Sequence, residues 1–171
     1  YKDLLAKFPE TEGAGEAHYW IGVGHFDLEQ YEEALLELGK AREIDTGNED
    51  KSTLRIVIAH YQLENIEKLA VEAKRYLTNV PAIAEGTAPA KRTPIPPQIM
   101  EYVGRKLAEG AQYEDAEYFL TSISDPKQPD KTSASVWKLI AECRAKLKKH
   151  PEAIAAYDHY LLQTERPSDR A

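Results

Sequence analysis

The stretch HYWIGVGHFDLEQYEEALLEL, residues 18–38, decides the fold of this chain. From residue 31 onward, apolar and small side chains recur with a 3.6-residue period, which predicts an amphipathic helix. The face predicted to be buried holds Tyr31, Ala34, Leu35, Leu38, Ala41 and Ile44. The opposite face holds Glu32, Glu33, Glu37, Lys40 and Glu43. Ahead of this helix, Gly22 lies twelve residues before Ala34, and the rest of the chain repeats that spacing.

Three further stretches align on the same spacing: residues 53–73, 101–120 and 135–157. In residues 101–120 and 135–157, a small residue again lies twelve positions before an alanine. In residues 53–73, larger residues lie at both of these positions. The aligned pairs are Gly104 and Ala116, Ala141 and Ala153, and Val57 and Leu69. Each copy predicts two helices joined by a tight turn. Four copies in phase indicate a repeat architecture, in which each unit covers the apolar face of the next.

These copies resemble the tetratricopeptide repeat, whose pattern is W-x₂-L-G-x₂-Y, then A-x₃-F, then P. The fourth copy supplies Trp137, Ile140, Ala141, Arg144, Ala153 and Tyr157 at the pattern positions. The first copy supplies His18, Ile21, Gly22, His25, Ala34 and Leu38. The resemblance implies an all-α fold, a right-handed superhelix of antiparallel helix pairs. The sequence of residues 6–35 also resembles that of bacterial periplasmic and outer-membrane-associated repeat lipoproteins.

The copies predict how the chain is divided. Residues 1–14 are expected to be the end of a truncated preceding repeat, and residues 15–80 to form two repeats. Residues 81–97 carry five prolines and are expected to be a linker or insertion. Residues 98–171 are expected to form two further repeats, separated by a loop at 124–133. The proline-rich segment could be a hinge, but we favour one continuous superhelix because a lone pair of repeats buries little surface.

Charge and composition limit the classes of partner. The net charge is −7, and residues 1–80 carry all of it, with 9 Lys and Arg against 16 Asp and Glu. This balance argues against nucleic-acid binding, which needs clustered positive charge. The acidic half could be a solubilising surface or an acidic docking face. No apolar run approaches the roughly 20 residues needed to span a bilayer. The sequence leaves the compartment open between the bacterial periplasm or outer-membrane periphery, which the lipoprotein resemblance implies, and the cytoplasm.

Several patterns could indicate chemistry, and each has a structural explanation. The Gly22-x-Gly24 stretch could contact a phosphate, but a dinucleotide-binding loop needs a third glycine where this chain has Asp27. His18 and His25 lie seven residues apart, but their equivalents in other copies are packing residues, so we expect no metal site. No catalytic constellation is recognisable, so we expect neither an enzyme nor a cofactor.

The region around Cys143 leaves two further questions open. Arg144 and Lys146 could lower the pKa of this only cysteine, but a half-buried structural thiol is the preferred interpretation. The basic residues 144–149 are expected to be a solvated helix end, with contact to a small anion or acidic peptide as the alternative.

A superhelix of this kind has a concave groove lined by the first helix of each repeat, which suits capture of a partner segment. The predicted groove residues are Tyr19, Val23, Phe26, Leu54, Arg55, Ile58, Tyr61 and Gln62. Alternatively, these side chains pack against a neighbouring repeat. Some relatives clamp acidic chaperone tails through Lys and Asn, but Tyr19 and Val23 occupy those positions here, which argues against that role.

The sequence therefore predicts a non-catalytic scaffold that binds a partner peptide or helix in its groove, as part of a larger protein or assembly. The alternative function is a structural spacer or oligomerisation segment. A protein or peptide is the expected partner, with no nucleic acid and no transmembrane segment. The oligomeric state stays open.

Overall fold

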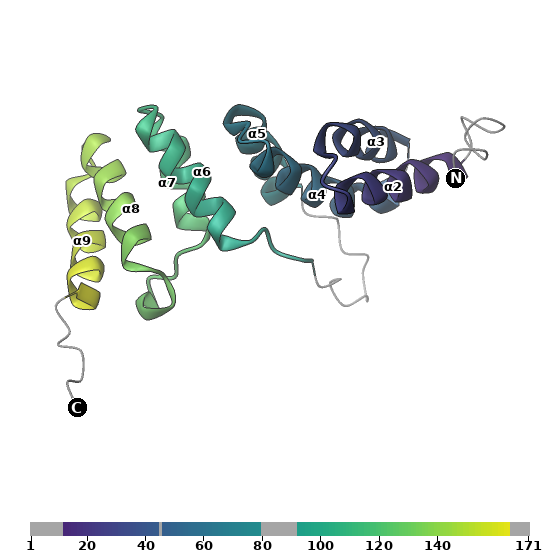
Figure 1. Ribbon diagram of the computed structural model, residues 1–171. Coiled ribbons are helices and arrows are strands. Elements are labelled where there is room, and N and C mark those ends of the chain that lie inside the picture. Colours follow the sequence, from purple (N-terminus) through teal and green to yellow (C-terminus); the bar gives the residue numbers. More distant parts are fainter. Residues whose placement is uncertain (1–11, 45, 80–91, 165–171) are drawn as a thin grey trace. The chain divides into compact units, whose positions relative to one another are not determined.

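The computed structural model describes residues 12–44, 46–79 and 92–164, and these residues are helical apart from turns and connecting segments (Figure 1). They form eight α-helices and no β-strand, which confirms the predicted all-α fold class. The chain divides into two compact units, residues 1–95 and 96–171. None of the described helices is long and apolar enough to cross a bilayer.

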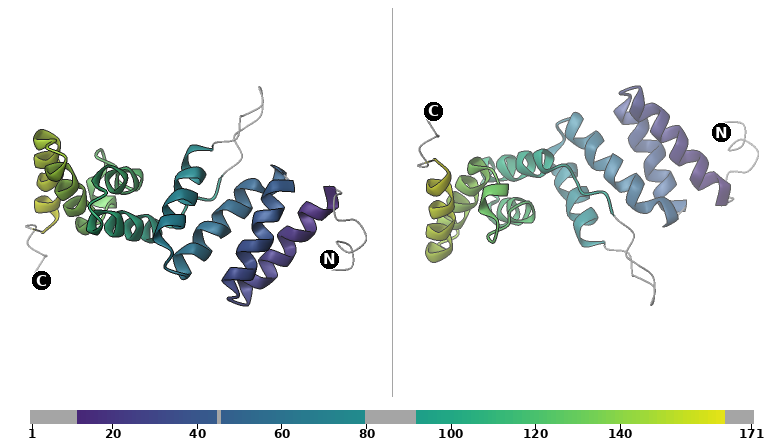
Figure 2. Two further views of the ribbon diagram at one scale, coloured as in Figure 1. Left: turned by 90° about the horizontal axis from the view of Figure 1, so that it is seen from above. Right: turned by 90° about the horizontal axis from the view of Figure 1, so that it is seen from below.

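The first unit contains α2 (Glu12–Asp27), α3 (Tyr31–Ile44), α4 (Glu49–Gln62) and α5 (Ile66–Thr78). Each of these helices packs on the next one along the chain, as the two views of Figure 2 also show. α2 begins at Glu12, slightly before the predicted start of the repeats. Residues 1–11, which carry most of the expected preceding repeat, lie outside the described residues.

The second unit contains α6 (Pro97–Glu109), α7 (Tyr113–Ser122), α8 (Ala134–Lys146) and α9 (His150–Thr164). α6 packs on α7, α7 on α8 and α8 on α9. α6 begins at Pro97, a residue that the sequence had placed in the linker; proline suits the first helical turn because its missing N–H needs no partner there. Residues 80–91 lie outside the described part of the chain. One continuous superhelix stays a prediction.

Every helix pair closes with the same turn. Each turn has one non-glycine residue in the left-handed region, five positions before the aligned second-helix residue: Glu29, Glu64, Ala111 and Lys148, with φ of 60°, 53°, 59° and 60°. In the first turn, Gln30 N–H donates to the His25 carbonyl at 2.9 Å and Glu29 N–H donates to that of Phe26 at 3.0 Å. This is the Schellman arrangement, which gives partners to carbonyls at the end of a helix. The other three turns repeat both bonds.

The predicted glycine packing is confirmed at Gly22. A Cβ atom added to this residue would lie 2.8 Å from Leu38 Cγ and 3.1 Å from the Leu38 backbone nitrogen. The contact brings α2 and α3 close together, and Ala34, Leu38 and Ala41 are buried at that interface. Ile44, predicted for the same face, is 43% exposed because it lies at the last position of the helix.

In the second copy, the large and small side chains at the helix-packing positions are exchanged between the two helices. Val57 replaces the glycine, and it is fully buried in α4. Sixteen positions later, where the first copy has Leu38, the second has Ala73 in α5, also fully buried. The larger side chain therefore lies on the first helix of this pair and the smaller one on the second.

The loop at 124–133 contains a short 3₁₀ helix, Pro129–Lys131. The Pro129 carbonyl accepts hydrogen bonds from Trp137 Nε1 at 3.2 Å and from Gln163 Nε2 at 2.7 Å. These bonds tie the loop to α8 and α9 and keep it within the second unit.

Candidate functional site

Two of the predicted groove residues meet across consecutive repeats. Arg55 Nη1 of α4 donates a hydrogen bond to Tyr19 Oη of α2 at 2.8 Å. The guanidinium also lies over the tyrosine ring, 5.4 Å from its centroid. Tyr19 is only 5% exposed and belongs to the core of the first unit. The pair therefore links α2 of the first repeat to α4 of the second.

Val23 and Phe26 lie beside this pair on α2. Both are half-buried and pack against the core cluster that contains Tyr19, Leu38 and Ile56. The Phe26 ring meets the Tyr31 ring edge to face, with centroids 5.6 Å apart. Packing within the repeats therefore uses part of each side chain and leaves the rest accessible.

The remaining predicted residues lie on α4. Leu54, Ile58 and Tyr61 are half-buried, as is Arg55, and Gln62 is exposed. We call these five residues, together with Val23 and Phe26, the α2–α4 strip. A strip of partly exposed aliphatic and aromatic side chains can anchor a partner segment, while Arg55 and Gln62 supply hydrogen-bonding groups.

The two histidines near the start of the chain have protein partners. His18 Nδ1 lies 2.6 Å from Glu37 Oε2, and His25 Nδ1 lies 2.7 Å from Gln30 Oε1. Burial alone would raise the pKa of Glu37, but hydrogen bonds from His18 and Lys40 hold it below its ordinary value. Within the described ranges no three His, Cys, Asp or Glu side chains group as a metal site would require.

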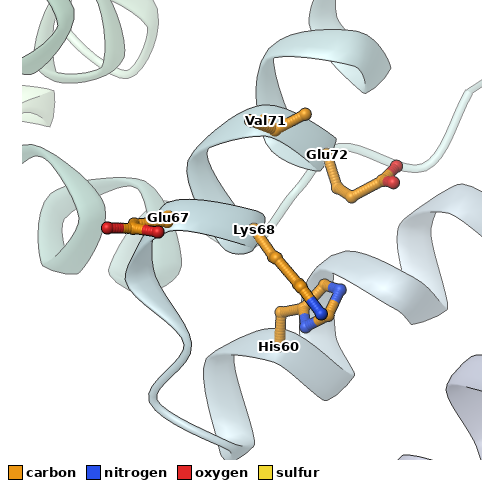
Figure 3. Close-up of a pocket in the computed structure, with 5 residues that line it drawn as sticks. All are labelled: His60, Glu67, Lys68, Val71 and Glu72. Atoms are coloured by element: carbon orange, nitrogen blue, oxygen red, sulfur yellow. The ribbon is translucent and has the colours of Figure 1, made fainter.

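A hollow that the sequence did not predict lies between α4 and α5, with a volume of about 280 Å³. His60, Glu67, Lys68, Val71 and Glu72 line it (Figure 3). His60 is 7% exposed, and burial lowers its pKa, which favours the neutral imidazole. Its Nδ1 has no hydrogen-bond partner in the described structure. In the alignment of the copies, His60 lies at the position of His25.

Cys143 is a buried residue of α8. It is 1% exposed, which corrects the expectation of half-burial. Burial, reinforced by the charges of Glu117 and Glu142, raises its pKa to about 11. The thiol therefore stays protonated at neutral pH and cannot act as a thiolate nucleophile.

The basic run beside Cys143 is partly engaged with α7. Arg144 Nε and Lys149 Nζ each lie 2.7 Å from an oxygen of Glu117. Two of its four cations thus join consecutive repeats. The other two, Lys146 and Lys148, are exposed, as expected for a solvated helix end.

Comparisons with known proteins establish the fold. No protein-family model matches the chain, and no curated protein matches its sequence. Among solved structures, the chain is similar to the crystal structure of MamA, with a TM-score of 0.52 and 14% sequence identity. The match covers 97% of this chain and 85% of MamA, a protein that contains tetratricopeptide repeats. The helix pairs of this chain therefore have a tetratricopeptide-like fold.

Proposed function

We propose that the chain is a non-catalytic protein-interaction scaffold, which holds a partner peptide or helix against the α2–α4 strip. The Tyr19–Arg55 pair is the observation that carries this proposal, because it holds the first helices of two consecutive repeats next to each other. Helical repeats of this fold commonly use such surfaces to bind extended or helical segments.

The strip suggests the chemistry of its partner. Half-buried Val23, Phe26 and Ile58 offer apolar and aromatic anchors, which contribute most of the binding energy at many interfaces. The first 80 residues carry a net charge of −7, so long-range attraction favours a partner segment that is apolar with basic flanks. Such charges mainly raise the association rate and select the partner.

Site-specific photo-crosslinking tests the proposal. A photo-reactive residue replaces exposed Gln62 within the strip, and in a matched variant it replaces Val71 on α5, which is 67% exposed and outside the strip. We expect a discrete crosslinked partner from position 62 and none from position 71. Phe26→Glu and Tyr61→Glu should each reduce the crosslink at least tenfold, because a buried, unpaired charge opposes apolar contact.

Leu36→Glu is the control for these substitutions, because Leu36 is 59% exposed on α3. Circular dichroism should show the same helix content in all variants. Equal crosslinking from positions 62 and 71, or no effect of the two glutamates in folded protein, would contradict the proposal. That outcome would favour the alternative function of structural spacer.

A further inference from the structure

Residues 92–95, which we call the strap, lie against the first unit although the sequence had placed them in a linker. The strap has no helical structure, and only Pro96 separates it from α6. Its contacts are with Asp50, in the first turn of α4, and with Tyr76, near the end of α5. None of these residues belongs to the α2–α4 strip.

Arg92 is held from two directions. Its Nη2 lies 2.6 Å from Asp50 Oδ1, and its guanidinium lies 3.7 Å from the centroid of the Tyr76 ring. A charge-assisted hydrogen bond to a carboxylate, combined with stacking on an aromatic ring, binds a guanidinium strongly and selectively. Lysine cannot reproduce the planar stacking.

Tyr76 also binds the main chain of the strap. Its hydroxyl donates to the Thr93 carbonyl at 2.6 Å, and the residue is only 3% exposed. Burial raises the pKa of Tyr76, which keeps the donating proton in place at neutral pH. A hydrogen bond to a backbone carbonyl can form whichever residue lies at that position. It therefore selects an extended backbone and not a particular side chain.

The other residues of the strap also favour an extended backbone. Thr93 precedes Pro94, which disfavours helical backbone at Thr93. Proline has no N–H that would need a partner. Ile95 follows and is 5% exposed. An arginine anchor combined with a main-chain hydrogen bond suits the capture of an extended peptide.

We propose that Asp50 and Tyr76 form a second binding site, for an extended partner segment that carries an arginine. The strap occupies this site within its own chain and competes with the partner. Charge complementarity supports a basic segment as the ligand, because Asp50 in the first turn of α4 already pairs with Arg92, whereas the neighbouring Glu49 pairs with Arg75. The inference does not depend on the proposed function of the α2–α4 strip.

Competition within one chain has a definite thermodynamic consequence. A covalently attached ligand commonly has an effective concentration on the order of millimolar. A partner segment of ordinary affinity would therefore bind weakly until the strap is released. The apparent affinity is the intrinsic affinity reduced by the fraction of molecules in which the site is open.

A peptide of residues 90–97, AKRTPIPP, serves as the probe and the full chain as the receptor. Fluorescence polarisation measures its binding to the unsubstituted chain and to Arg92→Ala, which weakens the strap and leaves the site intact. We expect Arg92→Ala to bind the peptide roughly tenfold more tightly, since it removes one charge-assisted contact of the competitor. Adding Asp50→Asn to Arg92→Ala should reverse this gain.

The controls separate competition from altered folding. Arg105→Ala removes an exposed ion pair with Glu101 on α6 and should keep the weak peptide affinity of the unsubstituted chain. A peptide with glutamine in place of its arginine should fail to bind any variant. Thermal unfolding shows whether Arg92→Ala is folded, and Arg92→Lys gives a milder release if it is not. The proposal is wrong if strap release does not tighten binding in folded protein, or if Asp50→Asn leaves the affinity unchanged.

Discussion

The backbone of Gly104 in α6 lies so close to Leu120 in α7 that an added Cβ atom would be 2.5 Å from Leu120 Cγ. Gly22 and Leu38 have the same relationship in the first unit, at the same sixteen-residue separation. A methyl group at either glycine would push the paired helices apart. The close approach of each pair therefore depends on one hydrogen atom in place of a side chain.

Gly104→Ala should lower the free energy of unfolding by about 1 to 3 kcal/mol, as overpacking of a tight core typically does. Chemical denaturation followed by circular dichroism measures the change. Gly24→Ala is the matched control, because a Cβ atom there would meet nothing within 4 Å. That control should stabilise its helix by up to about 1 kcal/mol. Equal effects of both substitutions would contradict the packing role of Gly104.

At the left-handed turn residues, introducing a glycine should stabilise the protein. Lys148 has a φ of 60°, a conformation that costs a side-chain-bearing residue about 1 to 2 kcal/mol but suits glycine. Glycine also loses more entropy on folding, so Lys148→Gly should give a net stabilisation of about 0.5 to 1 kcal/mol. Thermal unfolding detects this as a higher Tm. Ala155→Gly, at an exposed position within α9, should lower the Tm, and a lower Tm for both would contradict the prediction.

The ion pairs of Glu117 predict a pH dependence. Burial alone would raise its pKa, but hydrogen bonds from Lys149 and Arg144 hold the pKa below its ordinary value. A folded-state pKa below the unfolded value means that the stabilisation is present above about pH 4.3 and is lost as the pH falls through the folded pKa. Glu117→Gln should therefore cost about 1 to 2 kcal/mol at pH 7 and progressively less below pH 4.

Glu142→Gln is the control for this experiment, because Glu142 and Lys138 are exposed and 3.8 Å apart. It should change stability by less than about 1 kcal/mol at any pH. Denaturation midpoints measured between pH 3 and pH 7 test both variants. A constant difference between Glu117→Gln and the unsubstituted chain would show that the ion pairs do not cause it.

Cys143 should resist thiol reagents in the folded protein. Its pKa of about 11 leaves very little thiolate at pH 8, and its side chain is buried. Reaction with an aromatic disulfide reagent should be slow in buffer and complete within minutes in denaturant. Because the chain has no other cysteine, absorbance reports this residue alone. Fast labelling of the folded chain would contradict its burial in α8.

The helix pairs could be predicted from sequence because their causes are local. The 3.6-residue period around Ala34 and the small residue at Gly22 reflect constraints within one helix or between two helices joined by a short turn. The same reasoning placed the turns and the structural role of Cys143. It mispredicted the exposure of Ile44, the start of α6 and the half-burial of Cys143.

The contacts that carry the functional proposals depend on residues far apart in the chain. The sequence indicated Tyr19 and Arg55 separately as surface residues, but their hydrogen bond and the burial of Tyr19 arise when α4 packs beside the first repeat. It showed Arg92 only as part of a proline-rich segment, whereas its binding to Asp50 and Tyr76 requires that segment to return to α4 and α5. Periodicity records which face of a helix is apolar, because that depends on spacing along one helix. Which side chains meet across repeats depends on the stacking of the helices, and only the tertiary structure decides it.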